Sequence, residues 1–298
     1  MTQSTSDPGR DAKAGSYGRP QSIEDLSNRF VVHPLSALVV KIALPLKISA
    51  NFVSVLGLGF GLLAGWFYFG QANPNFIVLA FASMFVWHVL DGADGRIARA
   101  TNTTSALGRI IDGVCDHLVF ASVYFGFTFY LLANGASGWV WVLVAAAVIS
   151  HAVQAAAYEE RRQNYHRRAN GIVRQHIAEG LSEVGGKRSL LAWGYDFLQR
   201  ISAVKVSPLD DRISELQAAG NHQQISKAVA RTVPLVRAWA LLNANNRTIM
   251  LAVFAWFGRP DLYLWYEAIV LTLVFAGLLV VERLMERSIL QEIDGSTS

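Results

Sequence analysis

The chain has 298 residues, of which 52% are hydrophobic and 16% are charged, and its mean hydropathy is +0.31. Soluble domains carry about 25% charged residues, so this composition excludes an ordinary soluble domain and predicts an integral membrane protein. A net charge of +4 and a single cysteine, Cys115, add little: no internal disulfide is available, and we expect no nucleic acid partner.

The N-terminal part of the chain is polar up to residue 28. Residues 1–28 are rich in Ser, Gly, Asp and Arg and lack the apolar core of a signal peptide, so we expect a disordered cytoplasmic tail. The next stretch, residues 34–46, is apolar but too short to span a bilayer, and lysines punctuate it. It is expected to form an N-terminal helix that lies at the membrane interface.

Six apolar stretches are each close to the ~20 residues that a bilayer requires. They cover residues 50–69, 75–98, 106–133, 138–158, 233–257 and 262–283. The predicted fold is therefore all-α, an integral membrane bundle of six transmembrane helices. Residues 29–161 are expected to hold the first four spans, residues 232–288 the last two, and residues 289–298 a C-terminal tail.

A polar insert, residues 162–231, separates the fourth and fifth predicted spans. Apolar residues recur on one helical face between Leu190 and Ile201, which is typical of an interfacial helix. The insert fits a small helical hairpin packing on itself equally well, because Asp210 and Asp211 mark the start of a helix and Gly220 its end. We expect a cytoplasmic helical insert and leave the two interpretations open.

Lys and Arg are unevenly distributed between the connections. Residues 161–231 contain 12 of them, whereas the connections after the first and third spans contain none. The positive-inside rule therefore places both termini and the insert in the cytoplasm. We expect a bacterial inner membrane, with any active site on the second and third spans facing the cytoplasm.

The second and third spans carry acidic and small residues at fixed spacing, in the pattern Asp91-x2-Asp94-Gly95-x2-Ala98-Arg99-x8-Gly108-x3-Asp112-x3-Asp116. Each aspartate pair is three or four residues apart and so shares one face of its helix. A carboxylate inside a bilayer costs roughly 2.5 to 3.5 kcal/mol, so four of them are expected to face a cation or a polar cavity. Oxygen ligands favour Mg²⁺, Mn²⁺ or Ca²⁺, and four carboxylates can hold two such ions.

An alternative to a metal site is a set of structural ion pairs with Arg96, Arg99 and Arg109. Three cations beside four carboxylates are, however, equally what a pyrophosphate substrate requires. Because the aspartates and small residues keep such regular spacing, we favour the metal site.

This pattern resembles, position for position, the motif of the CDP-alcohol phosphotransferase family (class I), membrane enzymes that join a CDP-activated group to an alcohol and release CMP. The resemblance covers about residues 30–160. It implies one or two Mg²⁺ or Mn²⁺ ions, two being expected, and a homodimer. It also implies a metal site at Asp91, Asp94, Asp112 and Asp116, in which Asp116 is the general base. The residues implied in CDP binding are Gly92, Gly95, Ala98, Arg99 and Gly108.

The resemblance supports two directions of transfer, and a third function stays open from the aspartates alone. We expect first a phospholipid synthase that transfers a phosphatidyl group from CDP-diacylglycerol to inositol, inositol phosphate, glycerol phosphate or serine. The alternative transfers a phospho-head-group from a CDP-alcohol to diacylglycerol or ceramide. A remote alternative is a cation transporter that uses intramembrane aspartates as an ion relay.

Other residues in the spans invite further hypotheses. Arg237 and Arg247 are unusual in an apolar span, and we assign them to acceptor binding. His88 lies three residues before Asp91 on the same face, where a hydrogen bond to a carboxylate or a packing role is expected. Gly57, Gly61 and Gly65 repeat every four residues and predict close helix packing, within the chain or in a dimer.

Overall fold

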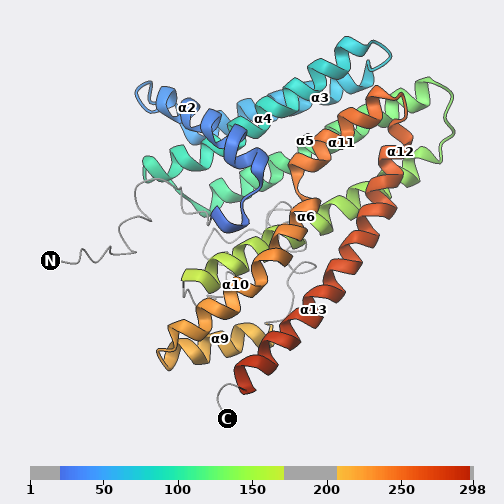
Figure 1. The fold of residues 1–298 in the computed structure, drawn as a ribbon. Coiled ribbons are helices and arrows are strands. Elements are labelled where there is room, and N and C mark those ends of the chain that lie inside the picture. The colour runs from blue at the N-terminus through green and yellow to red at the C-terminus, as the bar shows by residue number, and fades with distance from the viewer. Residues whose placement is uncertain (1–20, 171–206, 296–298) are drawn as a thin grey trace, which may run out of the picture.

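The computed structural model of the chain describes residues 21–170 and 207–295, and these ranges contain helices and no strand (Figure 1). Five helices in them are long and apolar enough to cross a membrane. They are α3 (Ala50–Phe69), α4 (Pro74–Ala100), α5 (Ala106–Ala133), α6 (Val140–Asn170), and a helix formed by α12 (Pro260–Trp265), the π-helical turn η4 (Tyr266–Val270) and α13 (Leu271–Gly295). The all-helical membrane bundle is thereby confirmed.

The fifth predicted span, residues 233–257, is not a single helix. Here α10 (His222–Trp239) runs into the turn η3 (Ala240–Leu242), and the backbone then leaves the helical region at Asn243, with φ −75° and ψ 164°. The Asn243 side chain accepts a hydrogen bond from the backbone N–H of Asn246 at 2.8 Å and so caps α11 (Ala244–Trp256). At about 1.5 Å per residue, α11 alone is shorter than the hydrocarbon core.

Glycines bring α3 close to its neighbours. A Cβ atom on Gly126 of α5 would lie 2.3 Å from the carbonyl oxygen of Gly65, and one on Gly61 would lie 2.2 Å from Val119. Gly57 faces α4, where an added Cβ would be in ordinary contact with Trp87 at 3.5 Å. The predicted packing role of the glycine ridge is confirmed, and its contacts lie within one chain.

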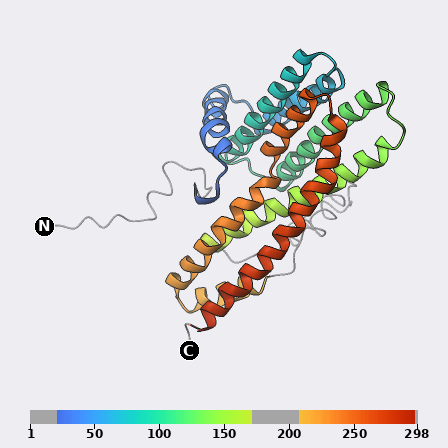
Figure 2. The same ribbon diagram turned by 45° about the vertical axis from the view of Figure 1, so that its right-hand side comes forward.

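A second helical layer lies below the α3–α4–α5 group in Figure 1, where α6, α10 and α13 run alongside one another (Figure 2). The helix α9 (Pro208–Ala218) turns into α10 at Gly220, whose φ is +71°. Both helices pack on the end of α13 through buried Ile213, Ile225 and Ile289. Residues 207–231 of the predicted insert thus lie in a helical hairpin that also packs on α13, and residues 162–170 belong to α6. Residues 190–201 lie outside the described residues. The helix α13 runs to Gly295, so it continues past residue 289, the start of the predicted C-terminal tail.

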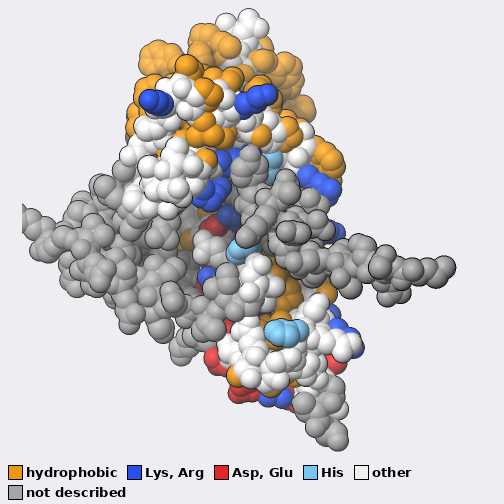
Figure 3. Space-filling model, turned by 90° about the vertical axis from the view of Figure 1, so that its left-hand side faces the viewer, with side chains coloured by type: hydrophobic (Ala, Val, Ile, Leu, Met, Phe, Trp, Pro, Cys, Tyr) orange, Lys and Arg blue, Asp and Glu red, His pale blue; other side chains and the backbone are white. Residues whose placement is uncertain are grey.

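The N-terminal helix α2 (His33–Ala43) packs on α4. Its face toward α4 buries Ser36 and Val40, while Leu38 and Ile42 are exposed on the other side. Its position at a membrane interface stays a prediction. Before α2, the turn η1 (Gln21–Ile23) contacts the second layer, since Arg237 Nε donates to the carbonyl oxygen of Ser22 at 2.6 Å. The π-helical η2 (Asn28–Val32) contacts α2 and α4. In the space-filling view, hydrophobic side chains cover much of the upper part of this face, with Lys and Arg side chains among them, and acidic side chains gather at its lower end (Figure 3).

Candidate active site

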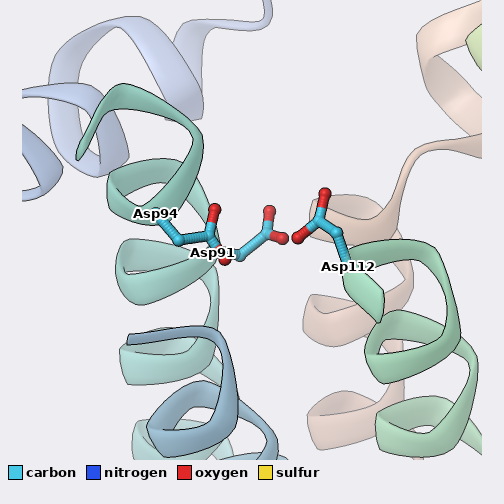
Figure 4. A group of neighbouring side chains, drawn as sticks. All are labelled: Asp91, Asp94 and Asp112. Atoms are coloured by element: carbon cyan, nitrogen blue, oxygen red, sulfur yellow. The ribbon is translucent and has the colours of Figure 1, made fainter. Parts of the chain in front are cut away.

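Three aspartates of the motif converge between α4 and α5. Asp91 and Asp94 extend from α4 and Asp112 extends toward them from α5 (Figure 4). One carboxylate oxygen of each lies within 4.8 Å of the others. Asp94 is buried, and the other two are half-buried. Like charges this close repel each other, and a divalent cation bound between oxygen ligands offsets that repulsion.

The hydroxyl of Ser54 on α3 orients Asp94. Ser54 Oγ donates to Asp94 Oδ2 at 2.6 Å. Ser54 lies one turn into α3, whose start is fixed by Ser49: the Ser49 side chain accepts from the backbone N–H of Phe52 at 3.2 Å. Sequence reasoning missed Ser54. A hydroxyl near the start of an otherwise apolar helix is the pattern that points to it.

A capping serine also sets the start of α5 and thereby the position of Asp112. Ser105 has extended backbone, with φ −138° and ψ 159°, and its Oγ accepts from the backbone N–H of Gly108 at 2.9 Å. A Cβ on Gly108 would lie 3.2 Å from that hydroxyl, which leaves little room for a larger residue. Asp112 follows one turn later, on the face that meets α4.

Asp116 lies one turn beyond Asp112 on α5 and is half-buried. It interacts electrostatically with Asp91, Asp94 and Asp112 but is not among the residues whose oxygens gather within 4.8 Å. The structure therefore brings three of the four predicted ligands together and places the fourth beside them. This arrangement leaves the carboxylate of Asp116 available for a different task, and its role as general base stays a prediction.

The small residues of the motif have different surroundings. Gly92 faces α2, where an added Cβ would lie 2.6 Å from Ser36 Oγ. Gly95 lies beneath the exposed Arg99, since its added Cβ would be 3.4 Å from Arg99 Nη1, and Ala98 is half-buried on the same helix. The absence of a side chain at Gly92 thus allows α2 to pack closely on α4. The predicted contacts of these residues with CDP remain predictions.

Replacing Gly92 by Ala is expected to lower the free energy of unfolding by about 1 to 3 kcal/mol, because Ser36 has no room to move. Ser36 Oγ lies 2.8 Å from the carbonyl oxygens of both Val32 and Val89. Adding Ser36→Ala removes the colliding hydroxyl and should restore part of the loss. Thermal unfolding of the single and double variants in detergent measures this; a Gly92→Ala variant as stable as the wild type would refute the close packing.

Three arginines that the sequence singles out, Arg96, Arg237 and Arg247, bind other groups of the protein. Arg96 is buried, and its Nη1 donates to the carbonyl oxygen of His33 at 2.7 Å, which ties α4 to the start of α2. Arg247 is 1% exposed, lies 3.2 Å from the Glu267 carboxylate, and donates through Nη2 to Gln154 Oε1 at 2.7 Å. Arg237 lies at the surface and binds the backbone of the N-terminal segment. Acceptor binding by Arg237 and Arg247 stays a prediction.

Comparison with known proteins identifies the segment that carries this site. The model of the CDP-alcohol phosphatidyltransferase family matches residues 47–176, which include the aspartate cluster and all of α3 to α6. Choline/ethanolaminephosphotransferase 1 of Arabidopsis thaliana is 29% identical over 124 residues, covering 39% of this chain and 32% of that protein. Ethanolaminephosphotransferase 1 of Homo sapiens is 28% identical over 144 residues, covering 41% and 36%.

The chain spans about a third of the length of the curated relatives that it matches. The matched part is the part in which the sequence motif, the apolar helices and the converging carboxylates coincide. The segment at residues 47–176, which is less than half of the chain, is therefore similar to the CDP-alcohol phosphatidyltransferase family.

Proposed function

We propose that this protein is a metal-dependent CDP-alcohol phosphotransferase of a membrane, with its active site at the α4–α5 aspartates. The observation that carries the proposal is the convergence of Asp91, Asp94 and Asp112 within 4.8 Å, inside two helices apolar enough to span a bilayer. An intramembrane carboxylate is costly, so three together point to a function that uses their charge. The donor set consists of oxygens, which suits Mg²⁺ or Mn²⁺.

In this proposal Asp91, Asp94 and Asp112 hold the metal. The bound ion offsets the charge of the CDP pyrophosphate and stabilises CMP as a leaving group. The oxygen of the acceptor hydroxyl attacks the β-phosphorus, the bond from that phosphorus to the bridging oxygen breaks, and CMP departs. Asp116, beside the cluster on α5, takes the proton of the attacking hydroxyl. Ser54 keeps the Asp94 carboxylate turned toward the ion through its hydrogen bond.

The names of the relatives favour one direction of transfer. Both are phosphotransferases named for choline or ethanolamine, which supports a CDP-alcohol donor and a lipid alcohol as acceptor. This is the second of the two directions that the sequence left open. The phosphatidyl direction, from CDP-diacylglycerol to a small alcohol, becomes the other arm of the test.

The test follows the head group. Purified protein in lipid nanodiscs containing diacylglycerol is incubated with Mn²⁺ and CDP-choline or CDP-ethanolamine labelled in the head group. We expect the label to enter the lipid fraction, with Asp112→Asn protein as the blank. A parallel sample receives unlabelled CDP-diacylglycerol with labelled inositol, glycerol phosphate or serine. Transfer only in the parallel sample would reverse the proposed direction, and transfer in neither would refute the proposed function.

The proposal places the site at the cytoplasmic side of the membrane, in agreement with the 12 Lys and Arg of residues 161–231. A homodimer is implied by the family resemblance alone. The sequence suggests Gly61 and Gly65 as one possible dimer contact. In the structure both glycines pack against residues of the same chain, Val119 and Ser122. A dimer of this protein therefore needs another surface.

A further inference from the structure

A hydrogen bond connects the aspartate helix to α11, far along the chain. His88 lies three residues before Asp91 on α4, and its Nε2 is 2.9 Å from Thr248 Oγ1. Both side chains are buried, at 8% and 3% exposed. His88 shares its helical face with Asp91, so the bond acts one turn from the first metal ligand.

Thr248 is itself held in place by its neighbours. The preceding residue, Arg247, donates to Gln154 on α6 at 2.7 Å and lies 3.2 Å from the carboxylate of Glu267 on η4. Glu267 also accepts from the hydroxyl of Tyr263 at 3.0 Å. These groups fix the first turn of α11 against two other helices. Thr248 is therefore held in a fixed position, and its hydrogen bond orients the His88 side chain.

The hydrogen bond between His88 and Thr248 matters because it lies buried inside the helix bundle. A buried hydroxyl or imidazole that loses its partner finds no bulk water to replace it, so the loss is felt by the groups around it. Outer partners of metal sites are known to influence the affinity for the ion by about 10- to 100-fold. His88 is placed to do this for the α4 turn that bears Asp91 and Asp94.

We propose that Thr248 is a positioning residue of the metal centre, which acts through its hydrogen bond to His88 on the turn before Asp91. This inference rests on the proposed function, since it requires that the aspartates bind a divalent ion. It assigns to α11 a part in the site, although α11 lies outside the matched residues 47–176. It also explains why a charged pair is kept in the interior: Arg247 and Glu267 hold the turn that carries Thr248.

The test measures Mn²⁺ binding without substrate, by electron paramagnetic resonance on purified protein. Thr248→Val keeps the shape and removes the hydroxyl, and Thr248→Ser keeps the hydroxyl. The matched control is Thr128→Val: Thr128 is also buried, but its hydroxyl donates to the Tyr124 carbonyl oxygen of its own helix at 2.7 Å. We expect Thr248→Val to weaken Mn²⁺ binding about tenfold, and the Ser variant and the control to bind as the wild type does.

Thermal unfolding without metal shows whether each variant folds. If Thr248→Val does not fold, Thr248→Ala, which also lacks the hydroxyl and is smaller, replaces it. The effect must also pass through His88, so adding Thr248→Val to His88→Ala should weaken binding no further. Wild-type Mn²⁺ affinity in the folded hydroxyl-free variant, or equal loss in the Ser variant, would overturn the inference alone. Absence of Mn²⁺ binding in the wild type would overturn the proposed metal site together with it.

Discussion

Replacing Asp94 by Asn is expected to abolish Mn²⁺ binding and to lower the rate of CMP release roughly 1,000-fold or more. Asp94 is the buried member of the cluster, and neutralising it removes a ligand whose second oxygen Ser54 keeps in place. The bound metal is expected to stabilise the charge of the transition state by several kcal/mol. Losing it raises the activation free energy by that amount, and each 1.36 kcal/mol lowers the rate tenfold. The rate is measured from CMP formation, and the affinity from Mn²⁺ titration.

Two comparisons make this result specific. Asp116→Asn should retain Mn²⁺ binding but lose turnover, since Asp116 lies beside the gathered oxygens and is assigned the proton transfer. Asp261→Asn should behave as the wild type, because Asp261 pairs with Arg259 at 2.8 Å, at the start of α12. A wild-type rate in Asp94→Asn protein would remove the cluster from the mechanism.

Replacing Gly126 by Ala is expected to cost about 3 kcal/mol of unfolding free energy, the upper end of the range for overpacking. The added Cβ would lie 2.3 Å from the carbonyl oxygen of Gly65 and 3.3 Å from the backbone nitrogen of Phe69. Because both atoms belong to the backbone of α3, no side chain rotation relieves the collision. The two helices must move apart, which also disturbs the position of Ser54 on α3.

The matched control is Gly59→Ala on α3, where an added Cβ meets nothing within 4 Å. Alanine is favoured over glycine in a helix by about 1 kcal/mol, so this variant should be at least as stable as the wild type. Thermal unfolding in the same detergent compares the two. Equal unfolding midpoints for Gly126→Ala and the wild type would show that α3 and α5 are not packed this closely.

The long helices were predictable because apolar runs of the right length leave few alternatives in a bilayer. The predicted spans 50–69 and 106–133 coincide with α3 and α5. The stretch 233–257 was predicted wrongly as one helix, because apolar residues lie on both sides of Asn243, where the capping bond of that residue starts a new helix. Three asparagines within four residues, Asn243, Asn245 and Asn246, indicate this break in the sequence.

The site was predictable to the extent that it lies on neighbouring turns of two consecutive helices. Helical periodicity alone brings Asp91 and Asp94 to one face, and Asp112 joins them across a short connection. Ser54 and Thr248 are 40 and 160 residues away from their partners, and no spacing rule connects such positions. The same holds for Arg247, whose partner Glu267 lies on a different predicted span.

The most direct test of the proposed function is the stoichiometry of the reaction in nanodiscs containing diacylglycerol, with CDP-choline or CDP-ethanolamine and Mn²⁺. CMP is measured in the aqueous phase and the new phospholipid in the lipid phase. The proposed function predicts equal amounts of the two products, and loss of both when the metal is chelated or Asp94 is replaced by Asn. CMP formation without phospholipid, or formation that continues unchanged in the Asp94→Asn variant, would contradict it.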